Sequence, residues 1–75
     1  MISYASLKEE DTVLDIGAGF GFLSRMMAER CKTVLAVEAD AEVARILREQ
    51  VARLPNVHVI EGNIFKVSIP YFNKI

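Results

Sequence analysis

With 75 residues and a net charge of −1, the chain is one small domain or part of a larger one. A 52% share of hydrophobic residues excludes a disordered chain, and nine basic residues against ten acidic ones exclude the basic excess typical of nucleic-acid-binding surfaces. The single cysteine, Cys31, excludes an internal disulfide, fits a reducing cytoplasm, and is expected to be a buried small apolar residue.

The first half of the chain predicts a helix end, a strand and a helix. Residues 2–7 are expected to be the last turn or two of a helix, and the charged residues 8–11 argue against a signal peptide. Residues 12–16 (TVLDI) are nearly all apolar, which is typical of a strand buried on both faces. Residues 22–30 carry apolar side chains at helical spacing. No apolar run in the sequence reaches membrane-spanning length.

A second strand and a second helix follow. Residues 33–37 (TVLAV) predict a strand that ends at Glu38. Asp40 is expected to cap the helix of residues 41–54, because its carboxylate can accept a hydrogen bond from a free N–H group of the first turn. The apolar positions of this helix recur at offsets of three, four and seven residues, which places them in one stripe.

The remaining elements complete an α/β pattern. Residues 57–60 (VHVI) predict a third strand, and residues 72–75 (FNKI) resemble the start of a fourth. The order βαβαβ with short connections predicts a Rossmann-like parallel sheet with right-handed crossovers, in one domain spanning the chain. Ligands of such sheets bind beyond the carboxyl ends of the strands, where Gly17, Glu38 and Asn63 follow the three strands in turn.

A glycine-rich turn follows the first strand directly. Gly17, Gly19 and Gly21 form the pattern GxGxG, whereas the fingerprint of dinucleotide-binding proteins, GxGxxG, requires a glycine where this chain has Phe22. The GxGxG pattern suits a ligand whose amino-acid portion lies against the loop and which has no diphosphate. Ligand contact is favoured for the first two glycines, while Gly21 stays open between ligand contact and helix packing.

The stretches DIGAGFG, VLAVEAD and VIEGNIF resemble the class I S-adenosylmethionine-dependent methyltransferases. The wider frame DTVLDIGAGFGFLS, TVLAVEAD, PNVHVIEGNIFKVSIP and FNKI is similar, more narrowly, to the ribosomal RNA adenine N6-dimethyltransferases. The resemblance runs over nearly the whole chain. It implies that residues 1–75 are one incomplete cofactor-binding domain of an enzyme that binds S-adenosyl-L-methionine and dimethylates adenine N6 in small-subunit ribosomal RNA.

The resemblance also implies roles for individual residues. Glu38 would bind both ribose hydroxyls, and Asn63 would accept a hydrogen bond from the adenine amino group without the charge of the family's usual aspartate. Ala39 would pack the adenine more loosely than the larger residue usual there. Asp15 would order the loop and the methionine amino group. The expected cofactor contacts are Asp15, Gly17, Ala18, Gly19, Gly21, Glu38, Ala39, Asn63 and Ile64.

Catalytic residues are not expected within the chain. In the resembled family an Asn-Leu-Pro-Tyr-like motif after the fourth strand positions the target adenine for in-line methyl transfer, and it is expected after Ile75. The chain alone is therefore predicted to be inactive, with RNA contacts supplied by other parts. His58 has no second metal ligand at a suitable spacing, which favours a core or edge histidine over a metal site.

Two other functions stay open at this point: an oxidoreductase with a nicotinamide cofactor, and a noncatalytic RNA-binding or assembly factor that keeps the same fold. The crossovers are expected to place both helices on one face of the sheet. The alternation of side chains along the strands sends about half of their apolar residues to the other face. That uncovered face predicts that the isolated chain self-associates.

Overall fold

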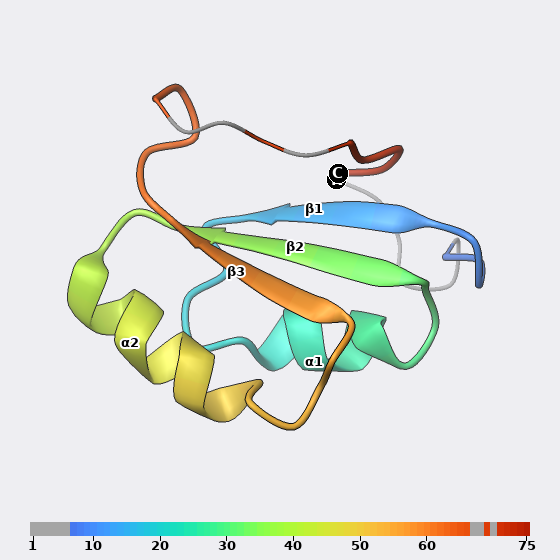
Figure 1. Cartoon of the computed structure of the whole chain (residues 1–75), viewed down its shortest axis with the longest axis horizontal. Coiled ribbons are helices and arrows are strands. Elements are labelled where there is room, and N and C mark those ends of the chain that lie inside the picture. The colour runs from blue at the N-terminus through green and yellow to red at the C-terminus, as the bar shows by residue number, and fades with distance from the viewer. Residues whose placement is uncertain (1–6, 67–68, 70) are drawn as a thin grey trace.

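A computed structural model describes residues 7–66, 69 and 71–75, and within them it confirms the α/β fold. Three parallel strands form one sheet in the order β1-β2-β3, with both helices on the same face (Figure 1). The predicted helix end at residues 2–7 lies outside the described residues except for Leu7. The elements are β1 (Thr12–Ile16), α1 (Phe22–Ala28), β2 (Thr33–Glu38), α2 (Ala41–Gln50) and β3 (Val57–Glu61).

The strand register brings the carboxyl ends of the three strands level with one another. Ile16 of β1 pairs with Val37 of β2, which pairs in turn with Ile60 of β3. One residue further along, Glu38 lies beside Glu61. The loops that follow the three strands therefore start at one edge of the sheet, which is where parallel sheets bind their ligands.

The main core lies between the sheet and the two helices. Leu47 of α2 and Val34 of β2 are both 0% exposed, so the packing there excludes water. The expected burial of Cys31 is confirmed at 8% exposure. The cluster consists of Leu7, Val13, Met27, Cys31, Val34, Ala36, Leu47, Val51 and Val57.

The starts and faces of the helices largely follow their sequence patterns. The predicted cap is confirmed, because Asp40 Oδ1 accepts a hydrogen bond from the Val43 N–H at 3.0 Å. On α1, Met27 faces the core with 4% exposure. Leu23 and Met26 of the same apolar pattern are instead 37% and 36% exposed, so the apolar stripe of α1 is only partly a core stripe.

Both helices end earlier than their apolar patterns predicted. Helix α1 ends at Ala28 instead of residue 30, and the Asn56 side-chain amide donates to the free Ala28 carbonyl at 2.8 Å. Helix α2 ends at Gln50 instead of residue 54. Pro55 disfavours helical backbone at Leu54, and the chain must turn there to enter β3. These ends depend on connections between elements, which side-chain periodicity does not report.

Most of the second face of the sheet is covered, so the prediction of an almost uncovered face is wrong. Figure 1 shows the chain after β3 running back across this face, opposite the helices, to reach β1. It supplies side chains that pack on three strand residues with 2–4% exposure. Self-association stays a prediction, without an uncovered face to support it. The strand residues are Leu14, Leu35 and Val37, and the residues packed against them are Ile60, Ile64, Ile69 and Phe72.

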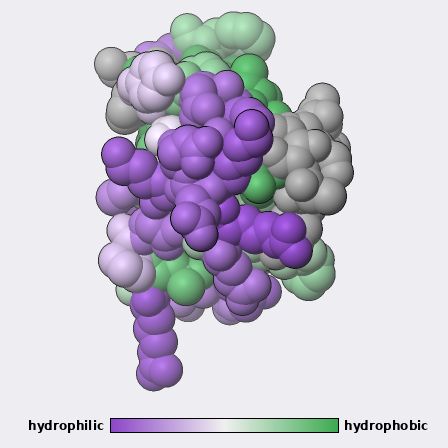
Figure 2. Space-filling model, turned by 90° about the vertical axis from the view of Figure 1, so that its right-hand side faces the viewer, coloured by the Kyte–Doolittle hydropathy of each residue, from purple (hydrophilic) through white to green (hydrophobic). Residues whose placement is uncertain are grey.

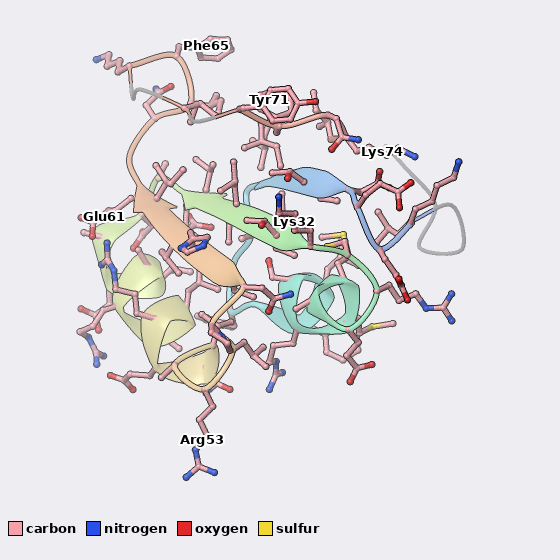
Figure 3. All side chains as sticks on the ribbon, turned by 45° about the vertical axis from the view of Figure 1, so that its right-hand side comes forward. Lys32, Arg53, Glu61, Phe65, Tyr71 and Lys74 are labelled. Atoms are coloured by element: carbon pink, nitrogen blue, oxygen red, sulfur yellow. The ribbon has the colours of Figure 1, made fainter. Side chains whose placement is uncertain are left out.

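The same C-terminal segment carries exposed aromatic side chains on its outer side. Phe65 is 91% exposed and Tyr71 is 79% exposed. Both lie on the side of the sheet away from the helices, whereas Arg53 extends from the helical side (Figure 3). The segment therefore packs Ile64, Ile69 and Phe72 against the sheet and directs Phe65 and Tyr71 to the surface.

The predicted start of a fourth strand lies beside β1. Lys74 forms a parallel bridge with Val13, and the Leu14 N–H donates to the Lys74 carbonyl at 2.7 Å. The Asn73 side chain strengthens this contact, because its Oδ1 accepts from the Thr12 N–H at 2.6 Å. The added segment thus extends the sheet on the β1 side, opposite β3.

Asp11 connects this segment to the turn before β1. Its side chain is nearly buried and accepts hydrogen bonds from the Asn73 amide at 3.0 Å and the Lys8 N–H at 2.9 Å. Lys74 Nζ lies 3.3 Å from Asp11 Oδ2. The pKa of the Asp11 carboxyl group is lowered, most strongly by the hydrogen bond from Asn73 and next by the one from Lys8.

Folding stability is expected to depend on the charge of Asp11 at acid pH. Because the pKa is lowered in the folded state, the stabilisation is present above the unfolded-state pKa of about 4 and is lost as the pH falls through the folded-state value. Asp11→Asn should therefore flatten the loss of thermal stability below about pH 4. Thermal unfolding followed by circular dichroism from neutral to strongly acid pH measures this, with Glu10→Gln as the control at an exposed neighbour. An unchanged acid slope in Asp11→Asn contradicts the prediction.

The two ends of the sheet differ in their surfaces. Figure 2 shows the end at which the strands begin, and hydrophilic residues cover most of it. Exposed charged residues at this end include Lys8, Glu9, Glu10 and Lys32. In the parts of the chain that the structure describes, neither helix is long and apolar enough to cross a membrane. The opposite end, where the strands finish, contains the residues that the sequence singled out.

Candidate functional site

The glycine-rich loop is a tight turn held against the end of β2. The N–H groups of Gly17 and Ala18 both donate to the Val37 carbonyl, at 2.9 and 3.0 Å. The Gly21 N–H donates to the Ala18 carbonyl at 3.1 Å. Since these N–H groups are already bonded, the loop offers a ligand mainly its carbonyl oxygens and its bare Cα surfaces.

The glycines of the loop differ in what surrounds them. At both Gly17 and Gly21 φ is positive, +70° and +89°, a conformation that other residues rarely adopt. A Cβ atom at Gly21 would lie 2.7 Å from Leu47 Cδ1 and 3.3 Å from Val51 Cγ1, so this glycine lets α1 pack against α2. A Cβ atom at Gly17 or Gly19 would meet no atom within 4 Å. The space for a ligand therefore lies at the first two glycines.

Glu38 links the glycine-rich loop to the start of α2. Its Oε1 accepts from the Gly19 N–H at 2.8 Å, and its Oε2 accepts from the Asp40 N–H at 3.0 Å. Each carboxylate oxygen has a second lone pair, so two further donors can bind without displacing these bonds. Glu38 thus lies at the edge of the sheet as both a loop anchor and a bidentate acceptor.

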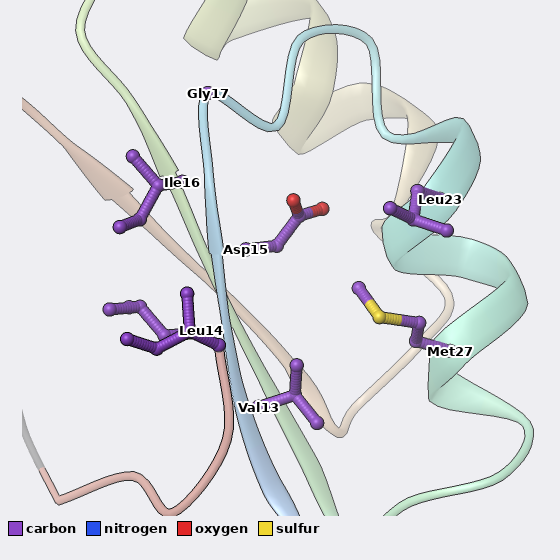
Figure 4. A pocket seen from close by; sticks show the side chains of 8 residues that line it. Val13, Leu14, Asp15, Ile16, Gly17, Leu23 and Met27 are labelled. Carbon is purple, nitrogen blue, oxygen red and sulfur yellow. The ribbon is translucent and has the colours of Figure 1, made fainter. Parts of the chain in front are cut away.

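Two hollows meet at the end of β1. The larger, of about 400 Å³, lies between β1 and α1 (Figure 4), and the smaller, of about 220 Å³, lies between the ends of the three strands. Ile16 and Gly17 line both. The other residues of the larger hollow are Val13, Leu14, Asp15, Leu23, Met27 and Ile75. Those of the smaller one are Val37, Glu38, Ala39, Gly62, Asn63 and Ile64.

Asp15 supplies the charge of the larger hollow. Figure 4 shows its carboxyl group between β1 and α1, in the space beside Leu23. Burial raises the pKa of Asp15, and a hydrogen bond from Ser24 Oγ to Oδ2, at 2.7 Å, opposes that rise. Sequence reasoning missed Ser24. The available signal was a hydroxyl at a core-facing position of an otherwise apolar helix.

The residues expected around an adenine gather in the smaller hollow. Asn63 is exposed, and its Oδ1 accepts from the Phe65 N–H at 2.9 Å, which leaves one lone pair of the amide oxygen for another donor. Ala39 also lines this hollow and is exposed, whereas Ile64 is half-buried because it also packs on the second face of the sheet. The structure thus brings Ala39, Asn63 and Ile64 together with Glu38 in one hollow, as the sequence predicted.

His58 does not belong to this site. It is exposed on β3 and pairs in register with Leu35, near the start of the strand and away from the carboxyl ends. The predicted core or edge position is confirmed as an edge position. The site thus contains acceptors and apolar walls: Asp15 suits a cationic group, and Glu38 suits a vicinal pair of hydroxyls.

Known proteins resemble this chain in sequence and in fold. The family model of ribosomal RNA adenine dimethylases matches residues 1–74. A probable ribosomal RNA small subunit methyltransferase A of Thermococcus kodakarensis is 43% identical over 74 residues, which are 99% of this chain and 26% of that protein. A dimethyladenosine transferase from Plasmodium falciparum has a similar crystal structure, with a TM-score of 0.83, 28% identity, and coverage of 93% of this chain and 26% of that one.

A third comparison involves a bound ligand. The structure of Aeropyrum pernix fibrillarin, determined with natively bound S-adenosyl-L-methionine, matches 75% of this chain and 26% of its own, with 28% identity and a TM-score of 0.68. This chain spans about a quarter of the length of the curated relatives that it matches. Because the family model matches residues 1–74 of this chain, and the fold is that of a dimethyladenosine transferase, the chain belongs to the ribosomal RNA adenine dimethylase family.

Proposed function

We propose that the site binds S-adenosyl-L-methionine across the end of β1. The methionine portion lies in the larger hollow near Asp15, and the adenosine lies in the smaller one, with its ribose hydroxyls on Glu38 and its adenine near Asn63. One observation carries this proposal: the two hollows meet at Gly17, where a Cβ atom would have no neighbour within 4 Å, and each hollow has its own carboxylate.

The chemistry of the site fits the two ends of this molecule. The amine of the methionine portion is a cation, and the Asp15 carboxylate lies in a hollow whose other described walls are uncharged side chains. The ribose presents two neighbouring hydroxyl donors, and Glu38 has one free lone pair on each oxygen to accept them. The volume of the larger hollow is within the range of about 300–1,000 Å³ typical of small-molecule sites.

For the whole protein we propose methyl transfer from S-adenosyl-L-methionine to adenine N6 in small-subunit ribosomal RNA. Family membership and the names of the relatives support this reaction. This chain would supply the cofactor site, including Ala18 and Ile64 beside the residues above. The residues that hold the target adenine and the RNA are expected in other parts of the protein. A cytoplasmic location, expected from the lone cysteine, accompanies the proposal.

Titration calorimetry of the whole protein tests the cofactor. S-adenosylhomocysteine, the product form, is expected to bind, whereas NAD is expected not to bind, because the loop lacks the third glycine of a dinucleotide site. Binding of NAD alone contradicts the proposal. Incubation with S-adenosyl-L-methionine and unmethylated small-subunit RNA, followed by mass spectrometry of the nucleosides, tests the reaction. Binding of S-adenosylhomocysteine without any dimethyladenine points to a noncatalytic scaffold.

A further inference from the structure

Ser24 is a buried polar side chain at the candidate site that the proposed function does not use. It lies on α1, is 0% exposed, and donates its hydroxyl to Asp15 Oδ2 at 2.7 Å. Burying a hydroxyl costs free energy unless the hydroxyl forms a hydrogen bond. Alanine or an apolar side chain at a buried helix position avoids this cost, and alanine also has a higher helix propensity than serine. The Ser24 hydroxyl is therefore best explained by its hydrogen bond to Asp15.

We propose that Ser24 is a positioning residue for the cofactor: it holds Asp15 Oδ2, so that Oδ1 receives the protonated amine of the methionine portion in the larger hollow. This inference rests on the proposed function. Within the described residues no hydrogen bond to Oδ1 is formed, and Figure 4 shows the carboxyl group in the hollow between β1 and α1. The residue acts on the cofactor only through Asp15.

The surroundings of Asp15 make this bond important for its charge. Burial is the largest influence and raises the pKa of the carboxyl group, while the Ser24 hydroxyl lowers it. The neighbours of Asp15 are uncharged. They are Leu23 and Met27 on α1 and Ala36 on β2, which pairs with Asp15. Within the described part of the chain, no other charged side chain lines the hollow. Removing the hydroxyl should therefore raise the pKa of Asp15 further.

Two ligands separate a positioning role from a merely structural one. S-adenosylhomocysteine contains the amino-acid portion, whereas 5′-methylthioadenosine has the same adenosine without it. A residue that acts through Asp15 affects only the first ligand. A residue that maintains the general shape of the loop affects both.

The experiment compares Ser24→Ala with Ser24→Thr in the whole protein by calorimetry. At neutral pH, Ser24→Ala should bind S-adenosylhomocysteine about three- to tenfold more weakly, the effect of losing one hydrogen bond, and methylthioadenosine within about twofold of wild type. The pH below which S-adenosylhomocysteine binding is lost should move upward. Ser24→Thr, which keeps the hydroxyl, should restore both properties. If Ser24→Ala does not fold, Ser24→Cys, whose thiol is a weak donor, gives the same contrast.

The outcomes are distinct. An equal loss for both ligands, or no loss for either, overturns the positioning role. A selective loss without any shift in the pH dependence also overturns it, because the charge of Asp15 is then independent of Ser24. If the wild-type protein itself does not bind S-adenosylhomocysteine, the proposed function fails, whereas normal wild-type binding with an unaffected Ser24→Ala overturns only this inference.

Discussion

Replacing Glu38 with alanine is expected to weaken binding of S-adenosylhomocysteine by about 5- to 150-fold, which corresponds to about 1–3 kcal/mol for unsatisfied polar partners. The substitution removes the acceptor for the ribose hydroxyls. It also removes the partner of the Gly19 N–H, which lies 2.8 Å from Oε1, and of the Asp40 N–H. Both effects act on the adenosine half of the ligand, so binding of methylthioadenosine should fall in parallel.

Two further variants control this prediction. Glu61 lies level with Glu38 on β3, is exposed, and pairs with Arg48, so Glu61→Ala removes the same side chain from the same edge without touching the loop. It should bind both ligands as wild type does. Glu38→Gln keeps one acceptor for Gly19 but loses the charge and the second acceptor, and it should give an intermediate affinity. Calorimetry measures each affinity, and equal binding by Glu38→Ala and Glu61→Ala contradicts the assigned role.

Alanine at Gly21 is expected to lower the free energy of unfolding by about 2–5 kcal/mol, compared with about 1–2 kcal/mol at Gly17. Both positions have positive φ, so an alanine at either is strained. Only at Gly21 does the new Cβ meet packed atoms, at 2.7 Å from Leu47 and 3.3 Å from Val51, with Leu47 itself fully buried. The added cost is overpacking of the contact between α1 and α2. Chemical denaturation of the two variants measures the difference.

Ligand binding should show the opposite order. At Gly17 the new methyl group enters the space between the two hollows, where the cofactor is proposed to cross the loop, and affinity should fall by about 5- to 150-fold. Folded Gly21→Ala should keep most of its affinity, because its methyl group points into the protein. A Gly17→Ala variant that binds S-adenosylhomocysteine as wild type does would show that the ligand passes elsewhere. Equal stability of the two variants would contradict the packing role of Gly21.

Local patterns in the sequence determined the elements and the place of the site. The apolar run TVLDI, the spacing of apolar residues on α2 and the cap at Asp40 each depend on residues within a few positions of one another. The strand, the start of α2 and its cap are confirmed, whereas α2 ends at Gln50 and not at residue 54. The site follows from the same local information, because the carboxyl ends of parallel strands share one edge and the glycine-rich turn and Glu38 come directly after two of them.

Contacts between distant residues decided the rest. Ser24 and Asp15 are nine positions apart, and Asn73 and Asp11 are 62 positions apart, so no periodic pattern links them. Whether Gly21 serves ligand contact or helix packing was decided by Leu47 on another helix. The prediction of an uncovered sheet face was wrong because the chain after β3 returns across that face. Side-chain periodicity reports which face of an element is apolar, whereas what packs on that face depends on the path of the whole chain.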